Sequence, residues 1–279
     1  MITSMKEILK YAEAKGTSLG AFNTPNMTTL RGVLAAAEAL NEPVIIMHAQ
    51  VHEEMGLCKM EEIAPVMLAL ADIAKVPVCV HLDHGTDLSY IKRGLELGFT
   101  SVMYDGTEHD EKLNTANTCI AREMSLAYGA SLEAEIGSMG SRESAAAGET
   151  DESIYTDPET AKRFVENTGV DALACAFGTV HGVYLKTPKL DFDRLERIQS
   201  LVNVPLVMHG GSGVSAENYK KVIARGIRKI NYYTYMSKAA GNAVAALKDL
   251  TYFHDIELAA VAAVKEDVTA AMKVFGNLE

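Results

Sequence analysis

The sequence lacks the features that mark several classes of protein. No apolar run approaches the length needed to cross a membrane. The first seven residues have no basic stretch followed by an apolar one, as a signal peptide would. The net charge of −11 argues against nucleic acid or an anionic membrane as the main partner. These absences predict a cytoplasmic protein with no nucleic-acid or membrane partner, while a small anionic substrate can still bind where the local charge is positive.

Cysteine is scarce and forms no paired motif. Cys58, Cys79, Cys119 and Cys175 are widely spaced, and no two of them make a Cys-x-x-Cys pair. Cys79 and Cys175 fall within stretches that we expect to be buried strands. This pattern favours core thiols in a reducing compartment over disulfides or a zinc knuckle.

What the sequence does contain is a regular alternation of buried strands and amphipathic helices. We expect strands at 18–23, 43–49, 77–85, 101–106, 131–137, 172–178, 205–209 and 228–234. We expect helices at 4–15, 28–40, 60–74, 87–97, 111–128, 158–167, 192–201, 216–225, 237–250 and 257–275. This count predicts the α/β class, as a (β/α)8 TIM barrel with extra N- and C-terminal helices. A doubly wound open sheet is the alternative, but it normally has fewer units and a Gly-x-Gly-x-x-Gly turn after its first strand, which is absent here.

No linker or low-complexity segment divides the chain, so the sequence predicts one barrel domain over residues 1–279. Only residues 138–157 interrupt the short connections, with a stretch of small, polar and acidic residues. Long loops after barrel strands are often lids. We therefore expect 138–157 to be a mobile active-site loop.

A cluster of ionisable residues ends the predicted strand at 77–85. The apolar run leads into His81, Asp83 and His84 and stops at Gly85. In parallel barrels this carboxyl end of a strand is where ligands bind. A buried carboxylate beside two imidazoles is costly unless something compensates, and a metal ion is the usual compensation. A hydrogen-bonded Asp–His pair without a metal would give the same pattern in this segment alone.

Polar residues also lie near the ends of the other predicted strands or shortly after them, at the same face of the barrel. They are Asp105, Glu133, Glu135, His181, His209, Asn231 and Thr234. Three histidines from different strands, with carboxylates between them, fit a catalytic zinc site that keeps one coordination position open. A single histidine at a strand end is usually structural, but three on one rim favour a metal.

The remaining histidines have weaker claims to a function. We expect His48 and His81 to be buried, either behind the metal ligands or simply in the core. We expect His52, His109 and His254 to lie at the surface.

A glycine-rich turn, Gly210-Gly-Ser-Gly213, follows His209 directly. Glycine-rich turns after the last two strands are the usual phosphate site of these barrels, because backbone N–H groups and a helix N-terminus point at the anion. Alone the turn would be no more than a flexible connection, but its position beside His209 favours phosphate binding.

These segments together resemble a known family. They are His-Leu-Asp-His-Gly at 81–85, Ser-Val-Met-Tyr-Asp-Gly at 101–106, Glu-Ala-Glu-Ile-Gly at 133–137, Gly-Thr-Val-His-Gly-Val-Tyr at 178–184, Val-Met-His-Gly-Gly-Ser-Gly at 207–213 and the Asn231 segment. In this order they are similar to the class II, zinc-dependent ketose-bisphosphate aldolases, which include fructose- and tagatose-bisphosphate aldolases. The resemblance covers almost the whole chain, from Gly20 to Thr234.

The resemblance implies a role for each matching residue. It implies that His84, His181 and His209 bind Zn²⁺, that Asp105 and Glu135 can hold a second or displaced metal, and that Asp83 is the acid/base at the aldehyde oxygen. Glu143, in the predicted lid, matches the mobile glutamate that moves a proton at C1 of dihydroxyacetone phosphate. The implied substrate-binding residues are Asn23, Gly182, Gly210, Gly211, Ser212, Asn231, Tyr232, Tyr233 and Thr234.

The resemblance also implies the reaction. A ketose 1,6-bisphosphate of fructose or tagatose type, or a related ketose 1-phosphate, would be cleaved to dihydroxyacetone phosphate and an aldehyde. Zinc would act as a Lewis acid that stabilises the enediolate formed when the carbon–carbon bond breaks, so no Schiff-base lysine is needed. The implied setting is carbohydrate metabolism such as glycolysis, and the implied assembly is a homo-oligomer, a dimer or a tetramer.

The sequence departs from the family pattern in the half of the site that would hold the aldehyde. Ala49 stands where a serine is common, Tyr232 and Tyr233 stand where smaller or acidic residues are common, and no arginine follows Arg228. The lid reads Gly-Ser-Arg-Glu-Ser at 140–144, in place of Gly-Gly-x-Glu-Asp-Gly.

These departures leave the aldehyde open. One alternative is an aldolase for a sulfonated, deoxy or unphosphorylated aldehyde, and another is a non-catalytic barrel that binds sugar phosphates. Lys186 or Arg142 could replace the missing arginine. The presence of Asp83 and all three histidines argues against the non-catalytic alternative.

Overall fold

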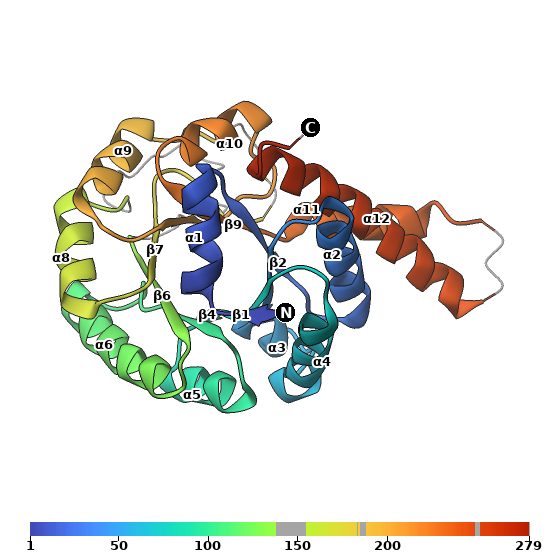
Figure 1. The fold of residues 1–279 in the computed structure, drawn as a ribbon, viewed down its shortest axis with the longest axis horizontal. Helices are drawn as coiled ribbons and strands as arrows, with labels where there is room; N and C mark the ends of the chain where they lie inside the picture. Colours follow the sequence, from blue (N-terminus) through green and yellow to red (C-terminus); the bar gives the residue numbers. More distant parts are fainter. Residues whose placement is uncertain (138–154, 183, 185–187, 249–251, 279) are drawn as a thin grey trace.

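Eight parallel strands form a closed barrel in the computed structural model, which describes residues 1–137, 155–182, 184, 188–248 and 252–278 (Figure 1). The barrel strands are β2 (Leu19–Asn23), β3 (Val44–Ala49), β4 (Val78–Gly85), β5 (Ser101–Tyr104), β6 (Ser131–Ile136), β7 (Ala172–Cys175), β8 (Leu206–Met208) and β9 (Ile227–Tyr232). Each strand pairs in parallel with the next, and β9 pairs with β2 to close the circle. The predicted (β/α)8 barrel is confirmed.

Helices surround the barrel and extend it at both ends of the chain (Figure 1). They are α1 (Met5–Lys15), α2 (Met27–Leu40), α3 (Gln50–Glu54), α4 (Met60–Ile73), α5 (Leu88–Leu97), α6 (Glu111–Ala127), α8 (Pro158–Thr168), α9 (Phe192–Leu201), α10 (Ala216–Ile223), α11 (Thr234–Ala245) and α12 (Phe253–Phe275). None of the described helices is both long and apolar enough to span a membrane.

Helix boundaries follow from capping residues in the sequence. Ser4 accepts a hydrogen bond from the Glu7 N–H at the start of α1, and Gly16 ends that helix in the left-handed conformation. Side-chain oxygens satisfy N–H groups that have no partner within the helix, and glycine adopts positive φ without steric cost. Other helices begin with the same chemistry, at Asn26, Asp87, Asp110, Asp157, Asp191 and Ser215.

The alternation of side chains along the strands builds two apolar layers. One set of strand residues packs outward against the helices. The other set points into the barrel, where Leu19, Ile45 and Val207 meet Met5 and Leu9 of α1. The extra N-terminal helix therefore closes one end of the barrel, and the opposite end is left for a site.

Two short elements were not predicted from the sequence. β1 (Ile2–Thr3) pairs with β4 outside the barrel, and α3 is a single short helix directly after β3. Neither is long enough to show a hydrophobic period. The last strand was predicted to run to residue 234, but it ends at Tyr232, so Thr234 is the first residue of α11.

The predicted mobile loop at 138–157 lies mostly outside the described residues. Its described end is anchored, since buried Thr156 donates a hydrogen bond to the Ile136 carbonyl and accepts one from the Ala176 N–H. Thr156 thus links β6 to the end of β7, and Asp157 caps α8. The mobility of 138–157 stays a prediction.

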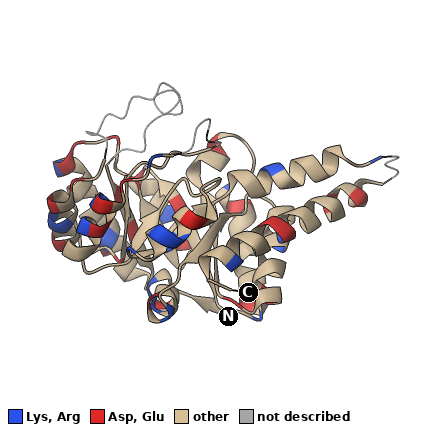
Figure 2. Ribbon diagram, turned by 90° about the horizontal axis from the view of Figure 1, so that it is seen from above, with Lys and Arg blue, Asp and Glu red and all other residues tan. Residues whose placement is uncertain are grey.

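Acidic and basic side chains are interspersed over the outer helices, and α11 and α12 project together from the barrel (Figure 2). α12 also packs along α2, so the predicted C-terminal helix is part of the outer layer. The four cysteines are free, and Cys79 and Cys175 are buried in strands, as predicted.

Candidate active site

Asp83 lies at the open end of the barrel and is held by two amides. Asn23 at the end of β2 donates to Oδ2 at 2.9 Å, and Asn231 on β9 donates to Oδ1 at 3.0 Å. Burial by itself would raise the pKa of Asp83, but the positive charges of His84 and Lys229 outweigh it and hold that pKa well below its usual range. Asp83 is therefore a fixed, ionised carboxylate.

Adjacent strand residues normally face opposite sides, yet both Asp83 and His84 face the barrel mouth. His84 has a positive φ of 48°, and the pairing of β4 with β5 shifts register between Leu82 and Gly85. A left-handed backbone at a residue other than glycine is strained and is often found at functional sites. This irregularity turns the imidazole of His84 towards the same space as Asp83.

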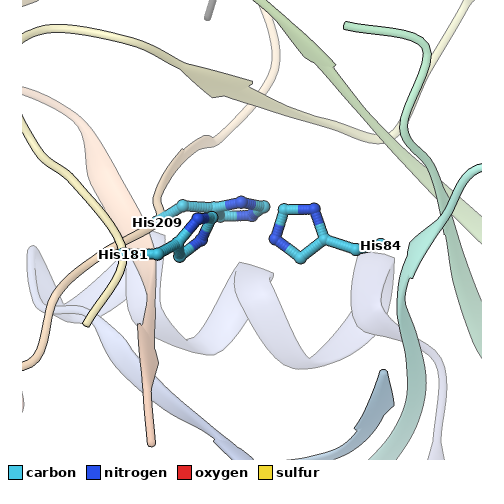
Figure 3. Close-up of side chains that lie close together, drawn as sticks. All are labelled: His84, His181 and His209. Carbon is cyan, nitrogen blue, oxygen red and sulfur yellow. The ribbon is translucent and has the colours of Figure 1, made fainter. Parts of the chain in front are cut away.

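Three histidine rings converge at this mouth, as Figure 3 shows. The ring centroids of His84 and His209 are 4.5 Å apart, those of His84 and His181 are 5.0 Å apart, and those of His181 and His209 are 6.0 Å apart. One ring nitrogen from each histidine lies within 4.8 Å of the other two. The nitrogens are close enough to converge on one metal ion.

Carboxylates fix the orientation of two of these rings. Asp105 contacts Nδ1 of His84 at 2.7 Å, and Glu133 contacts Nε2 of His209 at 2.9 Å. Nε2 of His84 is then left buried without a hydrogen-bond partner, while Nδ1 of His209 lies 3.1 Å from Oε2 of Glu135. A metal-binding histidine usually donates its other N–H to a carboxylate in this way. The donor set therefore fits zinc, which binds histidine nitrogen.

The surroundings shift the pKa values of His209 and His181 in opposite directions. Burial would lower the pKa of His209, but the carboxylates of Glu135 and Glu133 raise it to about 10. These carboxylates favour a positive charge at His209, and either a proton or a metal ion supplies one. The side chain of His181 is exposed at the mouth, yet the surrounding protein and the neighbouring charge of His84 lower its pKa to about 3. Asp105 and Glu135 also form a second possible metal-binding group with His84.

Beneath the histidines, a lysine is enclosed in the barrel. Lys229 on β9 has 0% exposure, and its Nζ lies 2.8 Å from Oε2 of Glu133, which is equally buried. His81 is buried as well, with Nδ1 2.8 Å from Ser101 Oγ. Sequence reasoning missed Lys229, because a lysine among the apolar residues of a strand gave no sign of its partner on β6.

The glycine-rich turn packs against the loops that follow β7 and β9. Gly210 has a φ of 63°, and a Cβ there would lie 2.4 Å from the Val180 carbonyl oxygen, so only glycine fits. The Gly211 N–H donates to the Asn231 carbonyl at 3.1 Å. Tyr184 donates its hydroxyl to the Gly210 carbonyl at 2.8 Å. Hydrogen bonds and close packing therefore fix the conformation of the turn.

The predicted substrate residues at the end of β9 face different parts of the structure. Tyr232 packs its ring on Phe22 and Phe275 between the barrel and the helices, so its side chain faces away from the mouth. Strand alternation explains this, because Asn231 faces inward. The Tyr233 N–H donates to Ser212 Oγ at 3.1 Å, and Thr234 opens α11, which has no side-chain N-cap.

Three further predicted positions have different outcomes. Gly182 follows His181 with a φ of 96°, and Glu143 lies outside the described residues. His52 was predicted to lie at the surface, but it is only 5% exposed and packs against Tyr233. That prediction is wrong because α3, which carries His52, was not foreseen.

Comparisons with known proteins agree with this geometry. The sequence model of the family described as fructose-bisphosphate aldolase class-II matches residues 3–279. The chain belongs to this class II aldolase family. It is therefore a carbon–carbon lyase.

Individual relatives cover the chain almost completely. A protein of Bacillus subtilis strain 168 named probable fructose-bisphosphate aldolase is 36% identical over 284 residues, which is 99% of this chain and 98% of that protein. The crystal structure of the YdjI aldolase from Escherichia coli K12 has a TM-score of 0.89 at 35% identity, over 99% of this chain and 98% of that chain. Fructose-bisphosphate aldolase from Campylobacter jejuni, at 23% identity, shares the fold, with a TM-score of 0.83 over 99% of this chain and 96% of that chain.

Proposed function

We propose that this class II aldolase is zinc-dependent and cleaves a ketose phosphate to dihydroxyacetone phosphate and an aldehyde. The observation that carries the proposal is the convergence of His84, His181 and His209 beside the ionised carboxylate of Asp83. The buried Nε2 of His84, which has no hydrogen-bond partner, supports zinc as the ion. Bound there, zinc would supply Lewis-acid polarisation of the ketose carbonyl.

Asp83 is the proposed proton acceptor and donor. In cleavage it takes the proton from the hydroxyl on the carbon that becomes the aldehyde, and in condensation it returns that proton. Asn23 and Asn231 orient the carboxylate through their amide N–H groups. Oδ1 of Asn231 is buried without a partner, so it is available to a hydroxyl group of the substrate.

The phosphate of the ketose is proposed to bind between Gly210–Ser212 and the start of α11, with Gly182 at its edge. An uncapped helix N-terminus attracts an anion through its free N–H groups. The N–H groups of Gly211 and Tyr233 are already used within the protein, so the anion would rely on others in this region. Glu143 is proposed to move the proton at C1 when substrate is bound.

The test separates zinc chemistry from Schiff-base chemistry. Chelation should abolish cleavage of fructose 1,6-bisphosphate, tagatose 1,6-bisphosphate or a ketose 1-phosphate, and zinc should restore it. Borohydride added with substrate should leave the protein mass unchanged. A borohydride-trapped lysine adduct would overturn the proposal, because it would show that the carbonyl is activated by an amine.

A further inference from the structure

Two tyrosine hydroxyls hold the carbonyl groups of the glycine-rich turn. Tyr184, beyond β7, donates to the Gly210 carbonyl at 2.8 Å, and Tyr219 on α10 donates to the Gly211 carbonyl. Burial raises the pKa of Tyr184 to about 12 and also raises the pKa of Tyr219, so both hydroxyls keep their proton at neutral pH. Both side chains are therefore hydrogen-bond donors to the turn and not proton-transfer groups.

The bond from Tyr219 fixes the direction of one peptide group in the turn. The ring of Tyr219 packs on Phe275 of α12, with centroids 4.8 Å apart, so the Gly211 carbonyl points outward to the helices. The described peptide bonds are all trans, and the Gly211 carbonyl shares its peptide group with the N–H of Ser212. In a trans peptide the two groups point in opposite directions. The Ser212 N–H therefore points away from those helices.

This N–H of Ser212 has no partner within the described part of the chain. Ser212 is only 4% exposed, and no described backbone or side-chain acceptor takes its N–H. A buried backbone N–H without a partner is costly, and nearly all such groups are paired with protein, water or ligand. Gly211 differs, because its N–H already donates to the Asn231 carbonyl. The Ser212 N–H is therefore a donor that the turn can offer to an anion.

Tyr184 makes a second contact, with the segment that carries His181. Its hydroxyl oxygen accepts a hydrogen bond from the Val180 N–H at 3.1 Å. Val180 directly precedes His181, and Gly210 directly follows His209. One hydroxyl thus joins the two segments that carry these histidines. The contacts of Tyr219, in comparison, lie in the turn and on α12.

We propose that Tyr219 and Tyr184 are positioning residues of the phosphate site, and that they present the Ser212 N–H to the phosphate of the ketose. Tyr219 sets the direction of this N–H, and Tyr184 holds the turn beside the segment of His181. Neither hydroxyl touches the substrate. This inference rests on the proposed aldolase function and names a group that binds its phosphate.

The direct test observes the Ser212 N–H by NMR. Dihydroxyacetone phosphate added to zinc-loaded, isotope-labelled enzyme should move the amide proton of Ser212 downfield, because a phosphate oxygen accepts its hydrogen bond. In Tyr219→Phe this shift should be smaller at saturation. If other amides at the barrel mouth respond to the ligand and Ser212 does not, the inference is wrong. If no amide responds, the ligand does not bind, which contradicts the proposed function and the inference with it.

Removing the two hydroxyls should have different effects. Tyr219→Phe keeps the ring and should raise KM for dihydroxyacetone phosphate by about 10-fold, as expected when a bond to a charged group is weakened, with kcat and zinc affinity close to the wild-type values. Tyr184→Phe should raise this KM similarly and also lower zinc affinity by about 10-fold, because the segment of His181 loses its bond to the turn. Steady-state condensation assays at saturating aldehyde and competition with a chromophoric chelator measure the two constants.

Tyr11→Phe is the matched control. It also removes a hydroxyl that donates within the protein, to Glu42 at 2.6 Å, but from α1 at the closed end of the barrel. Its KM and zinc affinity should equal the wild-type values. A merely structural role for Tyr219 and Tyr184 would lower Tm and leave KM unchanged, and that result would overturn the inference. Equal losses of zinc affinity in Tyr219→Phe and Tyr184→Phe would also contradict it, because only Tyr184 bonds the segment of His181.

Discussion

The two sides of the barrel mouth are built from different side chains. On the side of β4, β6 and β8, carboxylates surround the histidines, and Asp105 and Glu133 each fix one ring. On the side of β2, β3 and β9, the rings of His52 and Tyr233 pack together. Asp83 lies where the two sides meet. The comparison teaches that charged partners hold two of the histidines on one side of the mouth, whereas aromatic packing builds the other side.

The largest effect on kcat should come from a change at Asp83, which lies between the two sides of the mouth. Asp83→Asn removes the proton acceptor and should lower kcat by about 10²–10⁴-fold, the usual contribution of a positioned proton-transfer group. Binding of zinc and of dihydroxyacetone phosphate should persist, which equilibrium dialysis and a competition assay can measure. An effect on KM alone would mean that Asp83 only helps binding.

The buried ion pair under the histidines should control stability. Lys229→Met removes the lysine charge from the buried carboxylate of Glu133, which keeps only its contact with His209, and we expect a loss of about 3–5 kcal/mol in the free energy of unfolding. Urea denaturation of zinc-free protein measures this. The double variant Lys229→Met/Glu133→Gln should recover part of the loss, because no unpaired charge remains. A double variant no more stable than the single one would contradict this account.

The carboxylates behind the histidines should control metal affinity. Asp105→Asn and Glu133→Gln each weaken the contact that orients a ring, and each should lower zinc affinity by about 10–100-fold. Competition with a chromophoric chelator gives the constant without an activity assay. Glu108→Gln, in the same loop as Asp105 but exposed, is the control and should match the wild type. Equal affinities in all four proteins would show that the carboxylates do not tune the site.

Removing a hydrogen bond from the glycine-rich turn should have a smaller effect, on KM. Ser212→Ala removes the acceptor for the Tyr233 N–H, a bond that contributes about 0.5–1.5 kcal/mol. We expect KM for the ketose phosphate to rise by about 2–10-fold, with kcat close to the wild-type value. A steady-state measurement of both constants decides, and a loss confined to kcat would count against the proposed phosphate site.

The side of the mouth with the three histidines could be predicted from the sequence, and the side with His52 and Tyr233 could not. His84 and His209 lie at the ends of strands, and His181 follows one, and the apolar runs of these strands are visible in the sequence, so a parallel barrel had to bring the three histidines to one rim. His52 lies on a helix of five residues, too short to show a period. Its contact with Tyr233 depends on β2 lying between β3 and β9, which closure of the barrel brings about. Tyr232 was assigned to the site by the resemblance, and the sequence does not mark the point where strand alternation gives way to α11.

The central claim is that the histidines and carboxylates form a zinc-dependent site for dihydroxyacetone phosphate. This site should not need an aldehyde to act on dihydroxyacetone phosphate. The most direct measurement is exchange of the C1 proton of dihydroxyacetone phosphate in D₂O, followed by NMR with no aldehyde present. The account predicts exchange by the zinc-loaded enzyme, its loss after chelation and its return when zinc is added. Exchange that continues at the same rate in metal-free protein would contradict the account.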